Sequence, residues 1–263
     1  MSRIAPIPHE ELPEYEEGFA VIEAYMGFVP DSLRVMARVP GLLDAFTRLS
    51  GLVFLNDLLP SGLKQMLGHM ASAGAGCRYC QAHTAAHAEH LGVDPAKLAD
   101  LWTFETSPHF DDAERAALRL ALHSGQHPNQ VTDADFADCR RFYTDEAITA
   151  IVAVCALFGY LNRWNDTMAT TLEDIPTKVA ETLLAPSGWT AGKHADAWPS
   201  GCLLVPASRK EREQTTTIRE AREQGGARAG NAPNFAPSSS AMRSTRKRAA
   251  TTATRATGPG RRR

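Results

Sequence analysis

Two cysteines and two histidines stand within eleven residues of the chain, as Cys77, Cys80, His83 and His87. A thiolate is a nucleophile and two neighbouring thiols can cycle to a disulfide, while an imidazole exchanges protons near neutral pH. On an α-helix, at about 100° per residue, the four side chains fall within an arc of about 120° on one face. The segment therefore predicts a redox-active cysteine pair with a proton carrier beside it.

The spacing does not decide which sulfur attacks first, but it favours Cys80. This residue lies one turn inside the expected helix and three residues before His83, so it is the better placed of the two thiols to be activated. Cys77 would then resolve a sulfenic acid on Cys80 into a disulfide. His83 is within reach of Cys80, whereas His87, one turn further on, is equally well explained as a surface or packing histidine.

The motif has two other interpretations. C-x-x-C followed by H-x-x-x-H contains four ligand types that zinc accepts, but structural zinc sites take their ligand pairs from different segments, which surround the ion. Four ligands on one face of one helix cannot do so, and we expect neither a metal nor a cofactor. A purely structural role remains open, because free cysteines are common in protein cores. Cys139 and Cys155 stand alone on apolar stretches and are predicted to be core residues, while Cys202 carries no signal.

Charge divides the 263 residues into two unlike parts. Residues 1–195 hold 14 Lys and Arg against 25 Asp and Glu, a net charge of −11, whereas residues 196–263 hold 14 against 5, a net charge of +9. The N-terminus lacks the basic patch and apolar run of an export signal. The longest uncharged apolar run, 147–162, is shorter than the roughly 20 residues of a membrane span. We therefore expect a soluble cytoplasmic protein without membrane contact.

Helix signals follow one another from residue 14 to residue 184, and alternating strand patterns are nearly absent. Caps and apolar periodicity predict an all-α domain, in which Ser61 caps one helix, Asp94 and Thr132 start others, and Gly159 breaks a long one. The expected helices cover 14–26, 31–38, 40–53, 61–72, a motif helix after residue 76, 94–102, two that start near 112 and 132, 144–172 and 176–184.

The chain divides into an irregular arm at 1–13, a helical domain at 14–195 and a basic tail at 196–263. A weak echo at an offset of 83 residues, in which Gly76 meets Gly159, suggests a duplicated helix pair. The tail has too few large apolar residues to offset the entropy of ordering, so disorder is predicted. Its charge would attract nucleic acid, but a single aromatic residue, Phe235, stands among its arginines, and this favours a solvated tail without a specific partner.

Three segments resemble the carboxymuconolactone decarboxylase-like proteins, in the branch typified by alkylhydroperoxidase D and its peroxidase-related relatives. The resemblance spans about residues 20–195 and is carried by 59–64, by Gly-Cys-Arg-Tyr-Cys-Gln-Ala-His-Thr at 76–84 and by Leu-Asn-Arg-Trp-Asn-Asp-Thr at 161–167. It implies an all-helical fold built from an antiparallel helical pair, assembly as trimers or hexamers, and peroxide reduction by a cysteine pair that an external thiol or dithiol reduces again. Carried over by position, Cys80 corresponds to the peroxide-attacking cysteine and Cys77 to the resolving one.

Two positions depart from the family pattern. Thr84 stands where the family usually has its proton-relay histidine, with His83 one residue early, and Gln65 replaces a glutamate twelve residues before the first cysteine. An amide cannot take up a proton, so the usual relay cannot operate unchanged. His69, one turn beyond Gln65 on the same face, could substitute for it.

These observations predict a thiol-dependent peroxidase-type oxidoreductase, with peroxiredoxin activity on hydroperoxides, in which Cys77 and Cys80 form the redox centre and His83 is the acid or base. Lactone decarboxylation, as the family name suggests, is an alternative within enzymes, but it needs no cysteine pair. A non-catalytic redox sensor or interaction protein is the alternative from another class, and the altered relay positions give it weight.

Overall fold

The computed structural model describes residues 2–195, which form helices joined by turns and loops, with no β-strand in this range. The all-α prediction is therefore confirmed. The predicted basic tail and Cys202 lie outside the described residues. The helices are α1 (Glu16–Met26), α2 (Asp31–Met36), α3 (Leu42–Phe54), α4 (Ser61–Ala75), α5 (Arg78–His90), α6 (Pro95–Ala99), α7 (Asp112–Gly125), α8 (Asp133–Cys139), α9 (Asp145–Met168) and α10 (Asp174–Leu183), with short 3-10 turns η1 (His9–Glu11), η2 (Pro13–Tyr15), η3 (Leu101–Thr103), η4 (Ala185–Ser187) and η5 (Gly192–His194).

Two helix starts carry the caps that the sequence predicts. The Asp94 side chain accepts a hydrogen bond from the backbone N–H of Ala96, and Thr132 forms a reciprocal capping box with Asp135. The prediction for α4 is wrong by one residue, because Pro60 is the N-cap and Ser61 is already helical. Proline suits that place, since its fixed φ leads the chain into a helix and α4 needs no N–H from it.

The predicted break at Gly159 is wrong, because α9 runs as one helix of 24 residues. A glycine lowers helix stability by only about 1 kcal/mol, and the packing of α9 against α4, α5 and α7 outweighs that cost. Gly76, by contrast, has a left-handed φ of +74° and ends α4. The two glycines of the 83-residue echo thus do not occupy equivalent positions.

Helix α9 is also long and apolar enough to cross a membrane, judged by length and composition alone. The core helix of a soluble protein meets the same criterion, and half of the most apolar window of α9 is buried within the protein. The helix extends beyond the uncharged run 147–162 at both ends, where it includes Glu146 and Arg163. The finding is weak evidence for a membrane span.

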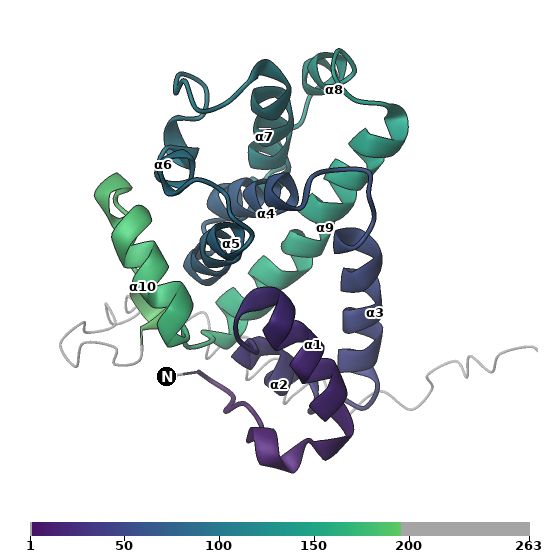
Figure 1. The fold of residues 1–263 in the computed structure, drawn as a ribbon, viewed down its shortest axis with the longest axis vertical. Coiled ribbons are helices and arrows are strands. Elements are labelled where there is room, and N and C mark those ends of the chain that lie inside the picture. The colour runs from purple at the N-terminus through teal and green to yellow at the C-terminus, as the bar shows by residue number, and fades with distance from the viewer. Residues whose placement is uncertain (1, 196–263) are drawn as a thin grey trace, which may run out of the picture. The chain divides into compact units, whose positions relative to one another are not determined.

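Helix α4 lies at the centre of the fold, against α5, α7 and α9, with α10 beside α5 and α3 beside α9 (Figure 1). The main core gathers the apolar faces of these helices, and fully buried side chains such as Leu67, Leu118 and Ile151 lie in it. Glycines let α4 and α7 approach backbone to backbone. An added Cβ at Gly125 would lie 2.0 Å from the carbonyl oxygen of Ala71, and one at Gly74 would lie 2.4 Å from that of Leu122.

A smaller core holds the N-terminal segment, where Leu12, Phe19, Leu33, Met36 and Leu43 pack together. The arm predicted as irregular contains the 3-10 turn η1 and hydrogen-bonds to the end of α9 and the residues after it. The backbone N–H of residue 3 donates to the Met168 carbonyl, and Ser2 bonds with Thr171. These contacts hold α1 and α2 over α5, which matters for the cavity described below.

The α4–α7 contact leads to a stability prediction. Gly125→Ala is expected to lower the free energy of unfolding by about 3 kcal/mol, because its Cβ meets rigid backbone and α4 and α7 must move apart. Gly159→Ala is the matched control in a helix: its Cβ meets nothing within 4 Å, so stability should rise by about 1 kcal/mol. Urea unfolding of both variants measures the difference, and equal stabilities would contradict the close approach.

Candidate active site

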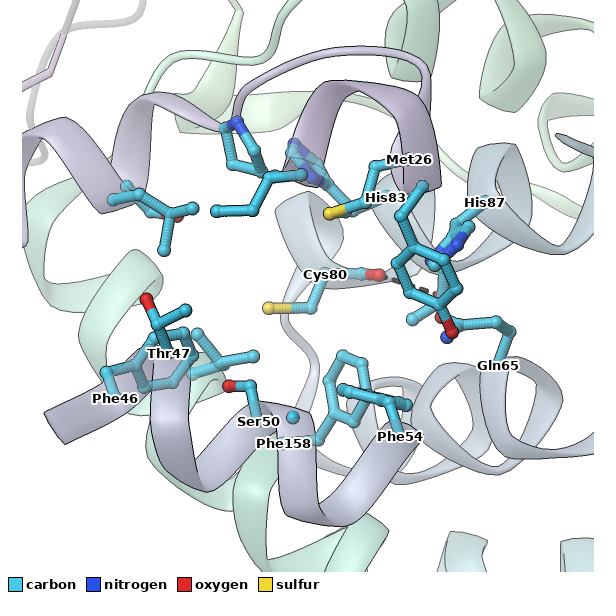
Figure 2. A pocket seen from close by; sticks show the side chains of 18 of the residues that line it. Met26, Phe46, Thr47, Ser50, Phe54, Gln65, Cys80, His83, His87 and Phe158 are labelled. Carbon is cyan, nitrogen blue, oxygen red and sulfur yellow. Dashed lines mark hydrogen bonds between the residues drawn. The ribbon is translucent and has the colours of Figure 1, made fainter. Parts of the chain in front are cut away.

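An apolar cavity of about 280 Å³ lies at the start of α5, between α1, α3 and α9. Cys80 points its sulfur into this space, with Phe54, Phe158 and Met26 among the walls and His83 and His87 at one side (Figure 2). Tyr25 from α1 and Phe46 from α3 complete an aromatic lining. Among the residues that the structure describes, no lysine, arginine, aspartate or glutamate lines the cavity.

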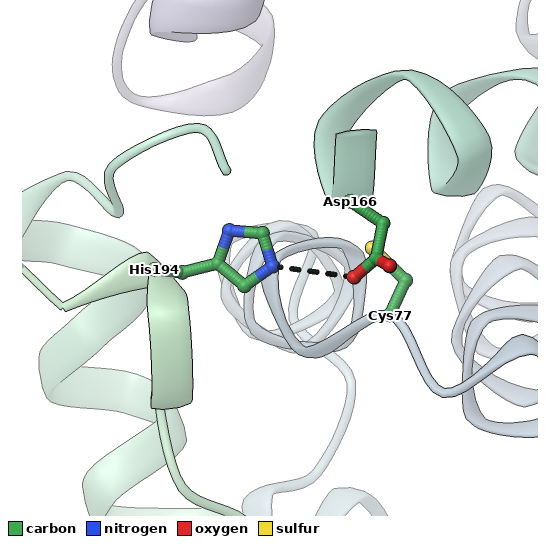
Figure 3. Close-up of side chains that lie close together, drawn as sticks. All are labelled: Cys77, Asp166 and His194. Atoms are coloured by element: carbon green, nitrogen blue, oxygen red, sulfur yellow. Dashed lines mark ion pairs between the residues drawn. The ribbon is translucent and has the colours of Figure 1, made fainter. Parts of the chain in front are cut away.

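The backbone at Gly76 and Cys77 decides where the two sulfurs lie. Gly76 ends α4 in the left-handed region, and Cys77 is the N-cap of α5 with an extended φ of −80° and ψ of 103°. Cys77 is therefore not part of the helix, and the predicted arc of four side chains is wrong for it. Cys80, His83 and His87 do line one cavity, whereas Cys77 lies beside Asp166 and His194 (Figure 3).

The two thiols of the cysteine pair differ in acidity. A hydrogen bond from the Cys80 thiol lowers the pKa of Cys77, against the opposing effect of burial. Burial and the neighbouring Cys77 raise the pKa of Cys80 well above its usual value, although Asn165 Nδ2, 3.7 Å from its sulfur, works in the opposite direction. The position predicted for Cys80 fits a cavity-facing nucleophile, but the more acidic of the two thiols is Cys77, at the helix start.

His83 forms an ion pair that the sequence did not reveal. Its Nε2 lies 2.6 Å from Oε2 of Glu173, and the other carboxylate oxygen accepts hydrogen bonds from the Tyr79 hydroxyl at 2.9 Å and the backbone N–H of Asp31 at 2.6 Å. The Tyr79 ring stacks on His83 at 4.0 Å between centroids. Burial raises the pKa of Glu173, but His83 and these hydrogen bonds outweigh it, so the pKa is lowered and the carboxylate stays charged.

Two of the suspected relay positions also line the cavity, together with Thr84. Gln65 reaches it from α4, and His87 lies with its ring edge against Tyr25, 4.5 Å between centroids. The Nε2 atom of His87 has no hydrogen-bond partner among the described residues, and burial lowers the pKa of this histidine to about 4. The Thr84 hydroxyl donates to the Cys80 carbonyl at 2.8 Å, so it stabilises helix α5.

The structure does not place His69 at the cavity of Cys80. Its Nδ1 lies 3.1 Å from the Gln81 carbonyl oxygen and 3.2 Å from the Thr84 hydroxyl, and it borders a different hollow next to Trp102 and Trp189. Burial lowers the pKa of His69 to about 4, so the ring is neutral at physiological pH. A neutral imidazole bonded to a carbonyl has no route to Cys80 in this arrangement.

A second group of chemical side chains lies on the other side of the cysteine pair. Donor atoms of Cys77, Asp166 and His194 come within 4.8 Å of one another (Figure 3). A thiolate, a carboxylate and an imidazole are donors that zinc accepts, but Lys193 Nζ already pairs with Asp166 at 2.7 Å and competes for that carboxylate. Neither His194 nor Lys193 has a local sequence signal, since both stand more than a hundred residues after Cys77.

The remaining predicted residues have clear places. The segment 161–167 does contribute to the site, through Asn165 beside Cys80 and Asp166 beside Cys77, but Arg163 bonds to His127 at 3.0 Å and to no aspartate among the described residues. Cys139 and Cys155 are buried core residues, as predicted, and burial raises the pKa of each thiol to about 11.

Comparison with known proteins agrees with the resemblance in the sequence. The model of the carboxymuconolactone decarboxylase family matches residues 40–123. A search of curated proteins gave no match. A variant of the debrominase Bmp8, solved in complex with 2,3,4-tribromopyrrole, is 30% identical with a TM-score of 0.66, over 68% of this chain and 96% of that chain.

Two peroxidase-related proteins have similar structures. One, an alkylhydroperoxidase AhpD core from Ralstonia eutropha JMP134, is 26% identical with a TM-score of 0.60, over 66% of this chain and 94% of that chain. The other, from Silicibacter sp. TM1040, is 23% identical with a TM-score of 0.56, over 65% of this chain and 89% of that chain, and at this identity it supports the fold alone.

Two buried, neutral histidines, His69 and His87, should make the stability of the protein sensitive to acid. Their folded pKa of about 4 lies below the unfolded value of about 6.5, so the unfolded chain binds more protons between these limits. Stability should be constant above about pH 6.5 and fall below it, by about 2 kcal/mol per histidine at about pH 5. His87→Gln should remove its own share in urea unfolding series, whereas the exposed His109→Gln should keep the full dependence; identical curves for the two variants would contradict the assignment.

Proposed function

We propose a function from one premise: the chain belongs to the carboxymuconolactone decarboxylase family, in its alkylhydroperoxidase D-like branch, which makes it an enzyme of the oxidoreductase or decarboxylase kind. Within that family we propose a thiol-dependent peroxidase that reduces apolar hydroperoxides with the Cys77/Cys80 pair. The observation that carries this proposal is the position of Cys80, whose sulfur faces an aromatic cavity while its hydrogen-bonded partner Cys77 lies behind it.

The reaction follows from that arrangement. The Cys80 proton passes along the hydrogen bond to Cys77, and the Cys80 thiolate attacks the terminal peroxide oxygen, so that the O–O bond breaks and an alkoxide leaves. The alkoxide takes up a proton to give an alcohol, and Cys80 is left as a sulfenic acid. Cys77 then attacks that sulfur, a disulfide forms and water leaves. The two electrons come from the thiols, and an external thiol or dithiol must return them.

The His83–Glu173 pair supports the proton steps of this cycle. The family has proton carriers at the positions that Thr84 and Gln65 occupy in this chain, and neither of these two side chains is one. His83 lines the cavity next to Cys80, and the buried Glu173 carboxylate, 2.6 Å from its Nε2, orients its ring. We assign His83 as the acid that protonates the leaving alkoxide, with Glu173 as its positioning residue.

Lactone decarboxylation fits the cavity less well. Its substrate class carries carboxylates, and a buried carboxylate requires a cation or several hydrogen-bond donors. No lysine or arginine lines the cavity within residues 2–195. An apolar hydroperoxide, by contrast, leaves only its terminal oxygens to be satisfied, next to Cys80.

Reductive dehalogenation is a second candidate, favoured by the 30% identity to a debrominase and by the aromatic walls around Cys80. The same two thiols would replace an aromatic C–Br bond by C–H, with release of bromide and a proton and formation of the disulfide. Trimeric or hexameric assembly and the external reductant remain predictions from the resemblance, and a cytoplasmic location remains a prediction from the sequence pattern.

Replacing either cysteine tests the peroxidase. Cys80→Ser should abolish turnover of cumene hydroperoxide with dithiothreitol, a loss of at least about 100-fold, because the nucleophile is removed. Without dithiothreitol, Cys77→Ser should consume about one equivalent of peroxide per protein, more slowly than wild type because Cys77 no longer takes up the Cys80 proton, and stall as a Cys80 sulfenic acid. Peroxide loss and mass spectrometry of the protein measure both results.

The same assay separates the alternatives. Equal peroxide loss in wild type and Cys80→Ser would contradict the peroxidase proposal. Bromide release from a brominated pyrrole, dependent on Cys80 and without peroxide turnover, would establish the dehalogenase instead. Disulfide formation by one equivalent of peroxide with no turnover would favour the redox sensor.

The ion pair leads to a further prediction. Glu173→Gln should slow peroxide turnover by about 10-fold or more, because His83 loses the carboxylate that holds its ring in place. The glutamine keeps an oxygen for the Asp31 N–H and the Tyr79 hydroxyl, so folding should be retained. Glu181→Gln, an exposed change on α10, is the matched control; equal rates for the two variants would contradict the role of the pair.

A further inference from the structure

We infer that the side of the cysteine pair opposite the cavity is a second catalytic site, where an external thiol attacks Cys77 and His194 takes up its proton. This inference rests on the proposed dithiol cycle, and it assigns the entry point of the reductant. The inference rests on one observation: donor atoms of Cys77, Asp166 and His194 lie within 4.8 Å of one another, on a side that the cavity does not reach (Figure 3).

His194 is held as a base. Its Nδ1 lies 2.7 Å from the Thr170 carbonyl oxygen, which can only accept, so Nδ1 carries the proton and Nε2 has a free lone pair. The side chain is 1% exposed, and Nε2 has no hydrogen-bond partner within the described residues, with Asp166 Oδ1 3.7 Å away. A buried acceptor left without a donor is unfavourable, and an arriving S–H group would supply one.

Burial keeps the ring of His194 neutral. It lowers the pKa of this histidine, against the opposite effect of Asp166 from α9, while Lys193 on its own turn reinforces the lowering. Tyr79 from α5 presents its ring at 5.7 Å, and Cys77, the N-cap of α5, presents its sulfur. The imidazole is therefore a free base at neutral pH, as a proton acceptor must be.

Asp166 connects this site to the solvent. Its side chain is 46% exposed and also lines an open groove of about 530 Å³ along α9, together with Ala75, Asn162 and Arg163. Cys77 itself is buried, so a reductant would approach along the groove and reach the sulfur past Asp166. The hydroperoxide and the reductant would thus meet the disulfide from opposite sides.

The Cys77–Cys80 disulfide would be reduced by thiol–disulfide exchange through a mixed disulfide. A dithiol loses one proton to His194 Nε2, and the resulting thiolate attacks Cys77 Sγ, which breaks the Cys77–Cys80 bond and forms a mixed disulfide. Cys80 leaves as a thiolate and takes up the proton from His194. The second thiol of the reductant gives its proton to His194, which is neutral again and passes it to the solvent. The resulting thiolate attacks the reductant's own sulfur in the mixed disulfide, so that Cys77 is released as a thiolate, the reductant becomes a cyclic disulfide and two electrons reach the protein.

The test isolates the reductive half of the cycle. Full-length protein is oxidised with diamide, which forms the disulfide without any peroxide, and its reduction by dithiothreitol is followed by trapping free thiols. At about pH 7, His194→Gln should slow this reduction by about 10-fold or more, while the reaction of the reduced variant with cumene hydroperoxide stays within about two-fold of wild type. At about pH 9.5, where dithiothreitol ionises unaided, the gap should close.

Equal reduction rates for wild type and His194→Gln near pH 7 would overturn the inference, and so would a gap that persists at high pH, which indicates a structural role. His109→Gln, an exposed histidine on the loop before α7, is the matched control and should reduce like wild type. Because diamide replaces the peroxide, this result can be interpreted even if the peroxidase proposal is wrong.

Discussion

The reversal of the backbone at Gly76 and Cys77 is the constraint on which the site depends. A left-handed glycine ends α4, and the next residue is an extended N-cap, so the chain enters α5 with one cysteine before the helix and one in its first turn. The two sulfurs stay in hydrogen-bond contact, yet they border different surroundings. A regular helix through both cysteines would have turned them toward the same cavity.

Different parts of the chain build the surroundings of Cys80 and of His83. The cavity of Cys80 is closed by the N-terminal segment, since Tyr25 and Met26 from α1 form part of its wall, and that segment is held by its own small core. His83, the proposed proton carrier, is oriented by Glu173, the N-cap residue of α10, whose carboxylate also accepts a hydrogen bond from the backbone N–H of Asp31 at the start of α2. One buried carboxylate thus joins α2, α5 and α10 at the site.

Sequence reasoning reached the helices and the cysteine pair because both are local signals: caps and apolar periodicity for the helices, a three-residue spacing for the thiols. It missed Glu173 and His194, since pairing across ninety residues or more leaves no trace in spacing. It also misplaced Cys77, because a helical projection assumes helical dihedral angles and an N-cap does not have them. His69 was suggested by its face on α4, but the carbonyl of Gln81 satisfies its ring instead.

The asymmetry of the two sulfurs gives the pair a direction. In the apolar cavity a charge on Cys80 is unfavourable, so its thiolate forms most readily when the proton moves to Cys77. At the helix start, with a donor from Cys80, a charge on Cys77 is favoured. When the disulfide is broken by attack on Cys77, the sulfur expelled is the one with the higher pKa, which must be protonated at once. His194, which has just received the proton of the reductant, can supply that proton to Cys80. An unpartnered imidazole beside Cys77 would therefore serve both halves of the exchange.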